Sequence, residues 1–132
     1  MNASIDDSGN KPVIVLRPEW GGVFAWLRNA DGTHDFFGFS ARWDDRPKAF
    51  RDATGASRET VRALCEWQTA FENCIEPEDA PFWRSRDPRV KSILKLLDAR
   101  AFELARRLKG EIGARFRVAV APLCRKWRDV EV

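Results

Sequence analysis

The N-terminal third of the chain shows hydrophobic patterns that are typical of short strands. Val13–Leu16 is a continuous apolar run that Pro18 should end, which predicts a buried strand. Val23–Leu27 alternates in a way that makes both of its faces apolar, so both should be covered. The dipeptide Asp31-Gly32 favours a tight hairpin turn, because glycine accepts a positive φ and aspartate tolerates it. Thr33–Phe39 should therefore form a third strand that pairs with the second.

Apolar residues spaced by three and four predict a helix in the middle of the chain. Before it, the charged stretch Ser40–Ala56 indicates a long irregular connection that Trp43 and Phe50 attach to the core. Ser57 has the side chain of a helix N-cap, so the helix should cover Arg58–Asn73. One face of this helix is apolar and should be buried, and it carries Val61, Leu64, Trp67, Phe71 and Cys74.

A second and longer helix is predicted after Asp87, because aspartate caps helices and Pro88 suits the first helical position. Its apolar face continues for roughly six turns up to Gly113. That face consists of Val90, Leu94, Leu97, Ala101, Leu104, Leu108 and Ile112. Residues 87–112 form either one helix or two, since Asp98 has the chemistry to cap a second helix after a break.

A last strand is predicted at Phe116–Val120, where apolar residues alternate before Pro122. The expected order of elements is therefore βββααβ. It describes an α+β domain in which a small mixed or antiparallel sheet, with three N-terminal strands and one C-terminal strand, packs against two helices. A chain of 132 residues fits a single domain with one core, and residues 1–11 should be a flexible start.

The composition is that of a folded domain. Hydrophobic residues make up 44% of the chain and charged residues 33%, which is too apolar for a disordered chain. The sequence has no apolar run of the roughly 18 residues that a membrane span needs, and residues 1–10 lack the pattern of a signal peptide. We therefore expect a cytoplasmic protein with no membrane contact, in which Cys65, Cys74 and Cys124 are reduced thiols.

The formal net charge of +3 is unevenly distributed along the chain. Residues 1–45 carry four basic and seven acidic side chains, which gives −3, so the remainder carries +6. On the second helix we expect a solvent-exposed basic face with an ion pair between Glu103 and Arg107. The alternative function is a nucleic-acid-binding accessory domain that uses the basic C-terminal two-thirds, and its binding would weaken steeply with salt.

Residue types that support catalysis are scarce in this sequence. The one histidine, His34, stands beside the hairpin turn, where an exposed polar role is expected. The three cysteines lack Cys-x-x-Cys spacing, and the sequence contains neither a phosphate-binding glycine loop nor a Gly-x-Ser-x-Gly motif. We expect a protein without enzymatic activity, metal or cofactor. A small enzyme that pairs His34 with a cysteine, or uses the acidic loop described next, is the third hypothesis.

The segment between the two predicted helices is the candidate binding site. Its acidic and aromatic side chains are Glu76, Glu78, Asp79, Phe82 and Trp83, and its two prolines exclude regular helix. A loop restricted by proline loses little entropy on docking, and an aromatic side chain can anchor a protein partner. Trp83 and Trp127 are the expected exposed aromatics. Asp31 and Asp35 on the hairpin would extend the same surface if the sheet edge lies near the loop.

Two segments of the chain carry a resemblance to a known family. They are Leu64–Glu72, with Trp and Phe on one helix face, and Leu104–Gly113, with Leu-Ala, Leu and a glycine stop before the strand around Val118. This arrangement resembles small bacterial proteins encoded beside polymorphic toxins. These include cytoplasmic immunity proteins of contact-dependent growth inhibition systems. The similarity covers Ser57–Val120 and is weaker over Val13–Trp26.

The resemblance implies an α+β immunity protein that binds a cognate toxin domain, encoded by a neighbouring gene, and blocks its active site or substrate path. Immunity proteins against nuclease toxins are often acidic, and the net charge of +3 departs from that pattern. The positive net charge is compatible with an immunity role if the acidic loop by itself makes the contact with the toxin.

Overall fold

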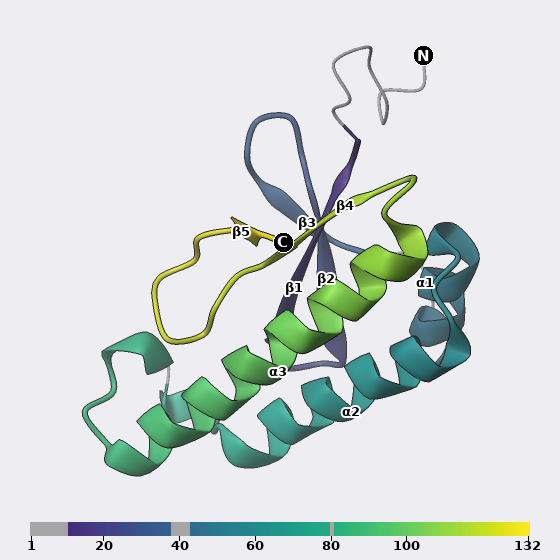
Figure 1. Cartoon of the computed structure of the whole chain (residues 1–132). Coiled ribbons are helices and arrows are strands. Elements are labelled where there is room, and N and C mark those ends of the chain that lie inside the picture. The colour runs from purple at the N-terminus through teal and green to yellow at the C-terminus, as the bar shows by residue number, and fades with distance from the viewer. Residues whose placement is uncertain (1–10, 38–42, 80) are drawn as a thin grey trace.

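The computed structural model describes residues 11–37, 43–79 and 81–132. A mixed five-stranded sheet lies beside three α-helices in the order βββαααββ (Figure 1). The strands are β1 (Val13–Glu19), β2 (Val23–Arg28), β3 (His34–Phe36), β4 (Arg117–Val120) and β5 (Val130–Glu131). The helices are α1 (Arg46–Thr54), α2 (Arg58–Cys74) and α3 (Pro88–Ile112). The α+β class is confirmed, whereas the predicted order βββααβ is wrong because it lacks α1 and β5.

The sheet has the strand order β3-β2-β1-β4-β5, with β4 parallel to β1 and the other neighbours antiparallel. Contrary to the prediction, β1 continues past Pro18 to Glu19. The pairing of β1 with β2 is irregular between Leu16 and Glu19. Such an irregularity accommodates Pro18, which has no backbone N–H group to donate. The third strand ends at Phe36, and its predicted extension through residues 38 and 39 lies outside the described residues.

Helix α1 lies in the stretch that the charge pattern assigned to an irregular connection. Pro47 stands in its first turn, and Gly55 ends it with a φ of +82°. These two residues are start and stop signals for a helix as well as loop formers, which explains the wrong assignment. Phe50 is buried and packs edge-on against Phe24 and Phe37, so its predicted attachment to the core is confirmed. The Trp43 side chain is outside the described part of the chain.

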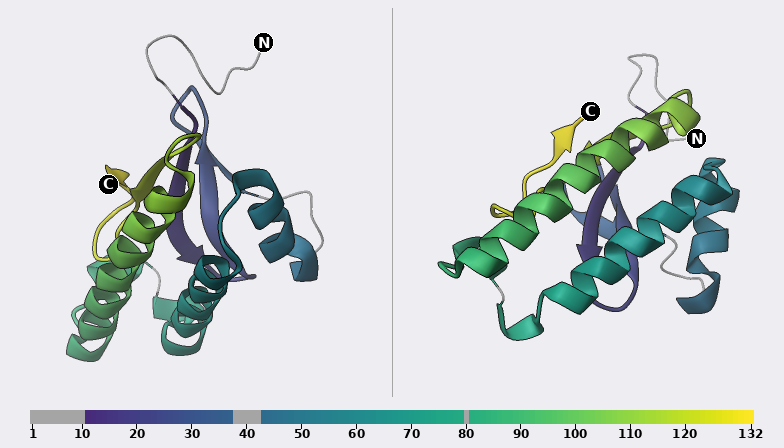
Figure 2. Two further views of the ribbon diagram at one scale, coloured as in Figure 1. Left: turned by 45° about the vertical axis from the view of Figure 1, so that its right-hand side comes forward. Right: turned by 60° about the horizontal axis from the view of Figure 1, so that its bottom comes forward.

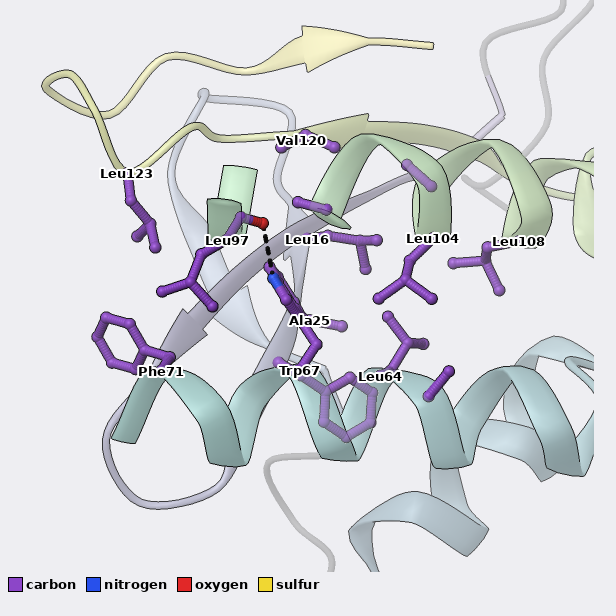
Figure 3. Packing of buried hydrophobic residues seen from close by; sticks show 14 of the residues in the cluster. Leu16, Ala25, Leu64, Trp67, Phe71, Leu97, Leu104, Leu108, Val120 and Leu123 are labelled. Atoms are coloured by element: carbon purple, nitrogen blue, oxygen red, sulfur yellow. Dashed lines mark hydrogen bonds between the residues drawn. The ribbon is translucent and has the colours of Figure 1, made fainter. Parts of the chain in front are cut away.

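Helices α2 and α3 run side by side across one face of the sheet (Figure 2). Their facing stripes share one apolar core with β1, β2 and β4 (Figure 3). The predicted shared core is confirmed and comprises Trp67, Phe71, Leu97, Leu104 and Leu108. The Trp67 indole N–H donates to the carbonyl oxygen of Leu97 at 2.9 Å, which satisfies a polar group inside this core.

The caps of both long helices follow the sequence. The Ser57 hydroxyl accepts from the N–H of Thr60, and the Asp87 carboxylate accepts from the N–H of Arg89. Helix α3 is continuous, so this segment forms one helix and the alternative of two helices is wrong. The Asp98 carboxylate does not cap a helix but accepts from the N–H groups of Leu123 and Cys124 in the turn after β4. None of the helices in the described residues has the length and apolar character required to span a membrane.

Candidate protein-binding site

The acidic loop begins where α2 ends, and buried contacts hold it in place. Ile75 is fully buried, and its carbonyl oxygen accepts from the Trp20 indole N–H at 3.2 Å. One residue later, the N–H of Glu76 donates to the carboxylate of Asp79 at 3.0 Å and closes a short turn. Asp79 is therefore a structural residue of the loop, while the side chains of Glu76 and Glu78 are exposed.

The two aromatic residues of the loop differ in burial. Phe82 is only 6% exposed and packs edge-on against Phe71 in the core, so little of its surface is left for contact with a partner. Trp83 is half-buried, which differs from the exposed position predicted for it, and it stands perpendicular to the Phe82 ring at a centroid distance of 5.6 Å. The core thus holds Phe82, and Phe82 in turn orients the Trp83 ring.

The hairpin aspartates do not extend this surface. The acidic loop meets the turn between β1 and β2, whereas the hairpin between β2 and β3 lies at the opposite end of β2 (Figure 1). Asp31 accepts from the N–H and hydroxyl of Thr33, and these hydrogen bonds lower its pKa. Asp35 accepts from the side-chain amide of Asn29 at 3.1 Å. Both carboxylates therefore stabilise the hairpin turn locally.

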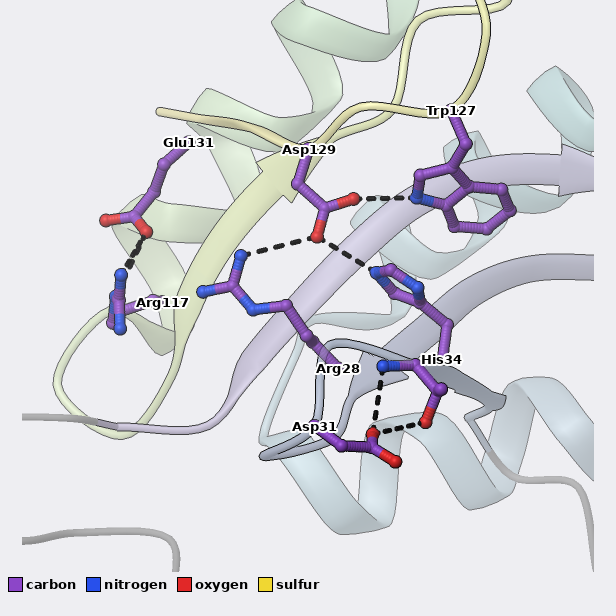
Figure 4. A network of polar contacts seen from close by, with 8 residues as sticks. Arg28, Asp31, His34, Arg117, Trp127, Asp129 and Glu131 are labelled. Carbon is purple, nitrogen blue, oxygen red and sulfur yellow. Dashed lines mark hydrogen bonds and ion pairs between the residues drawn. The ribbon is translucent and has the colours of Figure 1, made fainter.

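A polar network that the sequence did not reveal ties the C-terminal segment to the hairpin. Asp129 Oδ2 lies 2.9 Å from His34 Nε2 and 3.3 Å from Arg28 Nη1, and Asp129 Oδ1 accepts from the Trp127 indole at 2.7 Å (Figure 4). His34 and Trp127 are both half-buried, so neither is the exposed residue that was predicted. His34 is held by a carboxylate and an aromatic ring, and this network joins segments that are about 95 residues apart.

Arg17 is a buried cation on the same face of the sheet. Its side chain donates to the carbonyl oxygens of Ala121 and Pro122 at 3.2 and 3.0 Å. The guanidinium carbon lies 5.5 Å from the centre of the Phe82 ring and 4.8 Å from that of Trp127. Burial lowers the pKa of Arg17, although distant carboxylates act in the opposite direction. No carboxylate of the described residues forms an ion pair with it, so carbonyl groups and aromatic faces hold the charge.

Two of the three cysteines carry thiols that resist ionisation. Burial raises the pKa of Cys65. Burial of the sulfur, followed by a hydrogen bond with Asp98, raises the pKa of Cys124 to about 12 although the residue as a whole is exposed. A thiolate is the reactive form of cysteine, so neither side chain is prepared for nucleophilic attack at neutral pH.

The basic side chains of α3 are exposed and mostly unpaired in the described part of the chain. Glu103 pairs with Arg100 at 3.0 Å, whereas the predicted pair with Arg107 does not form there. Exposed basic residues on this helix without a described ion pair are Arg89, Lys91, Lys95, Arg106, Arg107 and Lys109. The expectation of a solvent-exposed basic face is confirmed, and this face stays available for an anionic partner.

No family model, curated protein or solved structure matches this chain. The candidate site is therefore defined by its own geometry. It consists of the exposed carboxylates of Glu76 and Glu78 on a loop that buried contacts hold in place, and of Trp83 further along the same loop. This arrangement suits docking to a basic protein surface.

Proposed function

We propose that this chain is a cytoplasmic immunity protein, which binds a cognate toxin domain and blocks its active site or its substrate path. The observation that carries the proposal is the acidic loop between α2 and α3, which buried contacts of Ile75 and Phe82 hold in place. Glu76 and Glu78 project from it into solvent, and the Asp79 carboxylate fixes its turn. The resemblance of the helical segments to immunity proteins suggests the class of partner.

The proposed interface is smaller than the sequence suggested. Glu76 and Glu78 attract a basic toxin surface and accelerate association, while Trp83 supplies apolar contact that slows dissociation. Asp79 and Phe82 act indirectly, because the first closes the turn and the second orients the tryptophan. A loop that is already fixed loses little conformational entropy when it binds.

The proposal is tested by measuring binding to the product of the neighbouring gene. Purified toxin domain is immobilised, and association and dissociation rates are recorded for the parent chain and its variants. The double variant Glu76→Gln with Glu78→Gln should associate at least about tenfold more slowly at low salt. Trp83→Ala should mainly raise the dissociation rate, by about tenfold.

A matched control makes the same charge change elsewhere. Glu59→Gln with Glu66→Gln alters two exposed carboxylates on α2 and should leave both rates within about twofold. Cells that express the toxin should survive with the parent chain and the control variant. Absence of a complex and of rescue with the parent chain would refute the proposed function. Unchanged rates in both loop variants would move the interface away from this loop.

A further inference from the structure

A small pocket lies between the start of α3 and the turn that follows β4. Its volume is about 100 Å³, and the buried side chains of Phe82 and Leu94 form its apolar floor. Trp83 contributes one wall. The polar lining consists of Ser85, Lys91, Lys95 and Cys124.

The two lysines give this pocket a net positive charge. Lys91 and Lys95 are four residues apart and therefore lie on the same face of α3. In the described part of the chain, no carboxylate forms an ion pair with either ammonium group. The Cys124 thiol adds no charge, because its pKa is raised to about 12.

One carboxylate, that of Asp98, hydrogen-bonds the Cys124 thiol at the pocket, and together with Lys91 and Lys95 it leaves a net charge of +1. Asp98 accepts from two backbone N–H groups, those of Leu123 and Cys124, and so fixes the turn that forms one side of the pocket. Asp87 caps α3 through the N–H of Arg89. Exposed basic residues without a described ion pair flank the pocket in sequence on both sides, namely Arg84, Arg86, Arg125 and Lys126.

We propose that this pocket binds an acidic side chain of an extended peptide segment from a partner protein. The carboxylate lies between Lys91 and Lys95 and accepts from the Ser85 hydroxyl, and the aliphatic stem contacts Trp83 and Leu94. A volume of about 100 Å³ gives room for one such side chain. The inference depends on this pocket alone and holds whether or not the partner is a toxin.

Charge complementarity with one small pocket favours a peptide over a nucleic acid. Proteins that bind single strands place successive bases on a series of aromatic rings along a basic groove. This pocket offers a single half-exposed ring, that of Trp83, because Phe82 is buried in the core. A lone acidic side chain matches it better than a row of bases.

The test measures binding of fluorescein-labelled peptides to the full chain by fluorescence anisotropy at low salt. One peptide alternates Glu and Gly over eight residues, and its counterpart has Gln in place of every Glu. The Glu peptide should bind at least about tenfold more tightly than the Gln peptide. Lys91→Gln with Lys95→Gln should remove that preference. The control Arg58→Gln with Arg62→Gln makes the same charge change on exposed residues of α2 and should retain the preference.

A further variant separates the pocket from diffuse charge. Ser85→Phe fills the pocket but keeps both lysines, so it should weaken binding of the Glu peptide by about tenfold. It also removes one exposed hydrogen bond, from the N–H of Asp87 to the Ser85 hydroxyl, so circular dichroism must show that the variant is folded at the assay temperature. Full binding by this variant, or equal binding of the two peptides, would overturn the proposal. Tighter binding of a labelled 12-nucleotide oligothymidine that depends on Lys91 and Lys95 would also overturn it in favour of nucleic acid. Toxin binding enters none of these measurements, so failure here and failure of the immunity role are distinguishable.

Discussion

Helices α2 and α3 cover one face of the sheet with a continuous apolar core, whereas the C-terminal segment covers the opposite face with mixed contacts. On the helix side, Leu64, Leu104 and Leu108 are fully buried in one cluster. On the other side the buried apolar cluster is small and comprises Val13, Val15, Ala119 and Ala121, with Trp26 and Trp127 packed against it. The buried charge of Arg17 and the network of Asp129 complete that face.

The two faces of the sheet are therefore stabilised in different ways, one by apolar burial and the other largely by polar and cation–π contacts. Apolar burial is non-directional and grows with the area removed from water, so it supplies most of the free energy of folding. Hydrogen bonds and cation–π contacts contribute less net energy but require exact partners. We infer that the helix side determines whether the chain folds, and that the helix-free side fixes where residues 125–129 lie. The helix side holds Leu123, Cys124 and Val132 through its core, the Asp98 carboxylate and the Lys109 ammonium group. Four predictions test this division, from the largest effect to the smallest.

The largest effect is expected from Leu104→Ala on the helix side. The substitution leaves a cavity between α3 and the sheet, which should lower the free energy of unfolding by about 2 to 5 kcal/mol in urea titration. Leu96→Ala is the control, because Leu96 lies on the same helix with 73% of its surface exposed and should change stability by less than about 0.5 kcal/mol. Equal effects of the two substitutions would contradict the helix-side core.

A smaller loss is expected from Asp129→Ala on the helix-free side. The substitution removes the hydrogen-bond partners of His34, Arg28 and Trp127, and should cost about 1 to 3 kcal/mol. Amide hydrogen exchange should rise mainly in residues 125–129, because the network holds that part of the C-terminal segment. A loss as large as that of Leu104→Ala, spread evenly over the chain, would remove the distinction between the two faces.

The third prediction concerns a polar contact at the edge of the helix side. Partial burial raises the pKa of Glu111, but hydrogen bonds from Ser57 and Thr60 together lower it below its ordinary value of 4.5. A carboxylate with a lowered pKa stabilises the fold above the pKa of the unfolded chain, and this contribution disappears as the pH falls through the folded pKa.

Urea titrations at several pH values test whether the pKa of Glu111 is lowered by folding. Glu111→Gln should reduce the free energy of unfolding at pH 7 by less than about 1 kcal/mol, since the side chain is exposed and screened. The gap between parent and variant should close as the pH falls below 4.5. A gap that widens with acid would show that the assigned direction is wrong.

The last prediction concerns Asp98→Asn, which keeps an acceptor for only one of the N–H groups of Leu123 and Cys124, because these donate to different oxygens of the carboxylate. Its effect should appear as thiol reactivity. Loss of the negative charge should lower the pKa of Cys124, so alkylation by iodoacetamide at pH 9 should become faster. Peptide mass spectrometry measures the rate, and Cys74 on α2 serves as the internal reference. An unchanged ratio of the two rates would exclude Asp98 as a cause of the raised pKa.

Local pattern determined the elements whose signals are strong and periodic. The stripes of α2 and α3 fixed which faces are buried, since a period near 3.6 residues over several turns has one interpretation. Cys74, which the stripe of α2 included, is the exception, because it lies in the last turn and is exposed. Asp31-Gly32 likewise placed the hairpin. The sequence pattern predicted short elements less well than long ones. Pro47 and Gly55 carry signals for a helix and for a loop alike, and the two residues of β5 are too few to show a period.

Only the tertiary structure decided which distant residues meet. From sequence alone, the Asp98 carboxylate serves a helix cap or a remote turn equally well, and the choice depends on where residues 123 and 124 lie. The carboxylates of Asp31 and Glu76 looked equivalent, but the direction of β2 places them at opposite ends of the sheet. Contacts between positions so far apart depend on how the chain packs, which local preferences do not encode. The sequence by itself therefore determined the two long helices and the acidic loop, whereas packing decided the burial of the Arg17 cation, the network at Asp129 and the pocket beside Trp83.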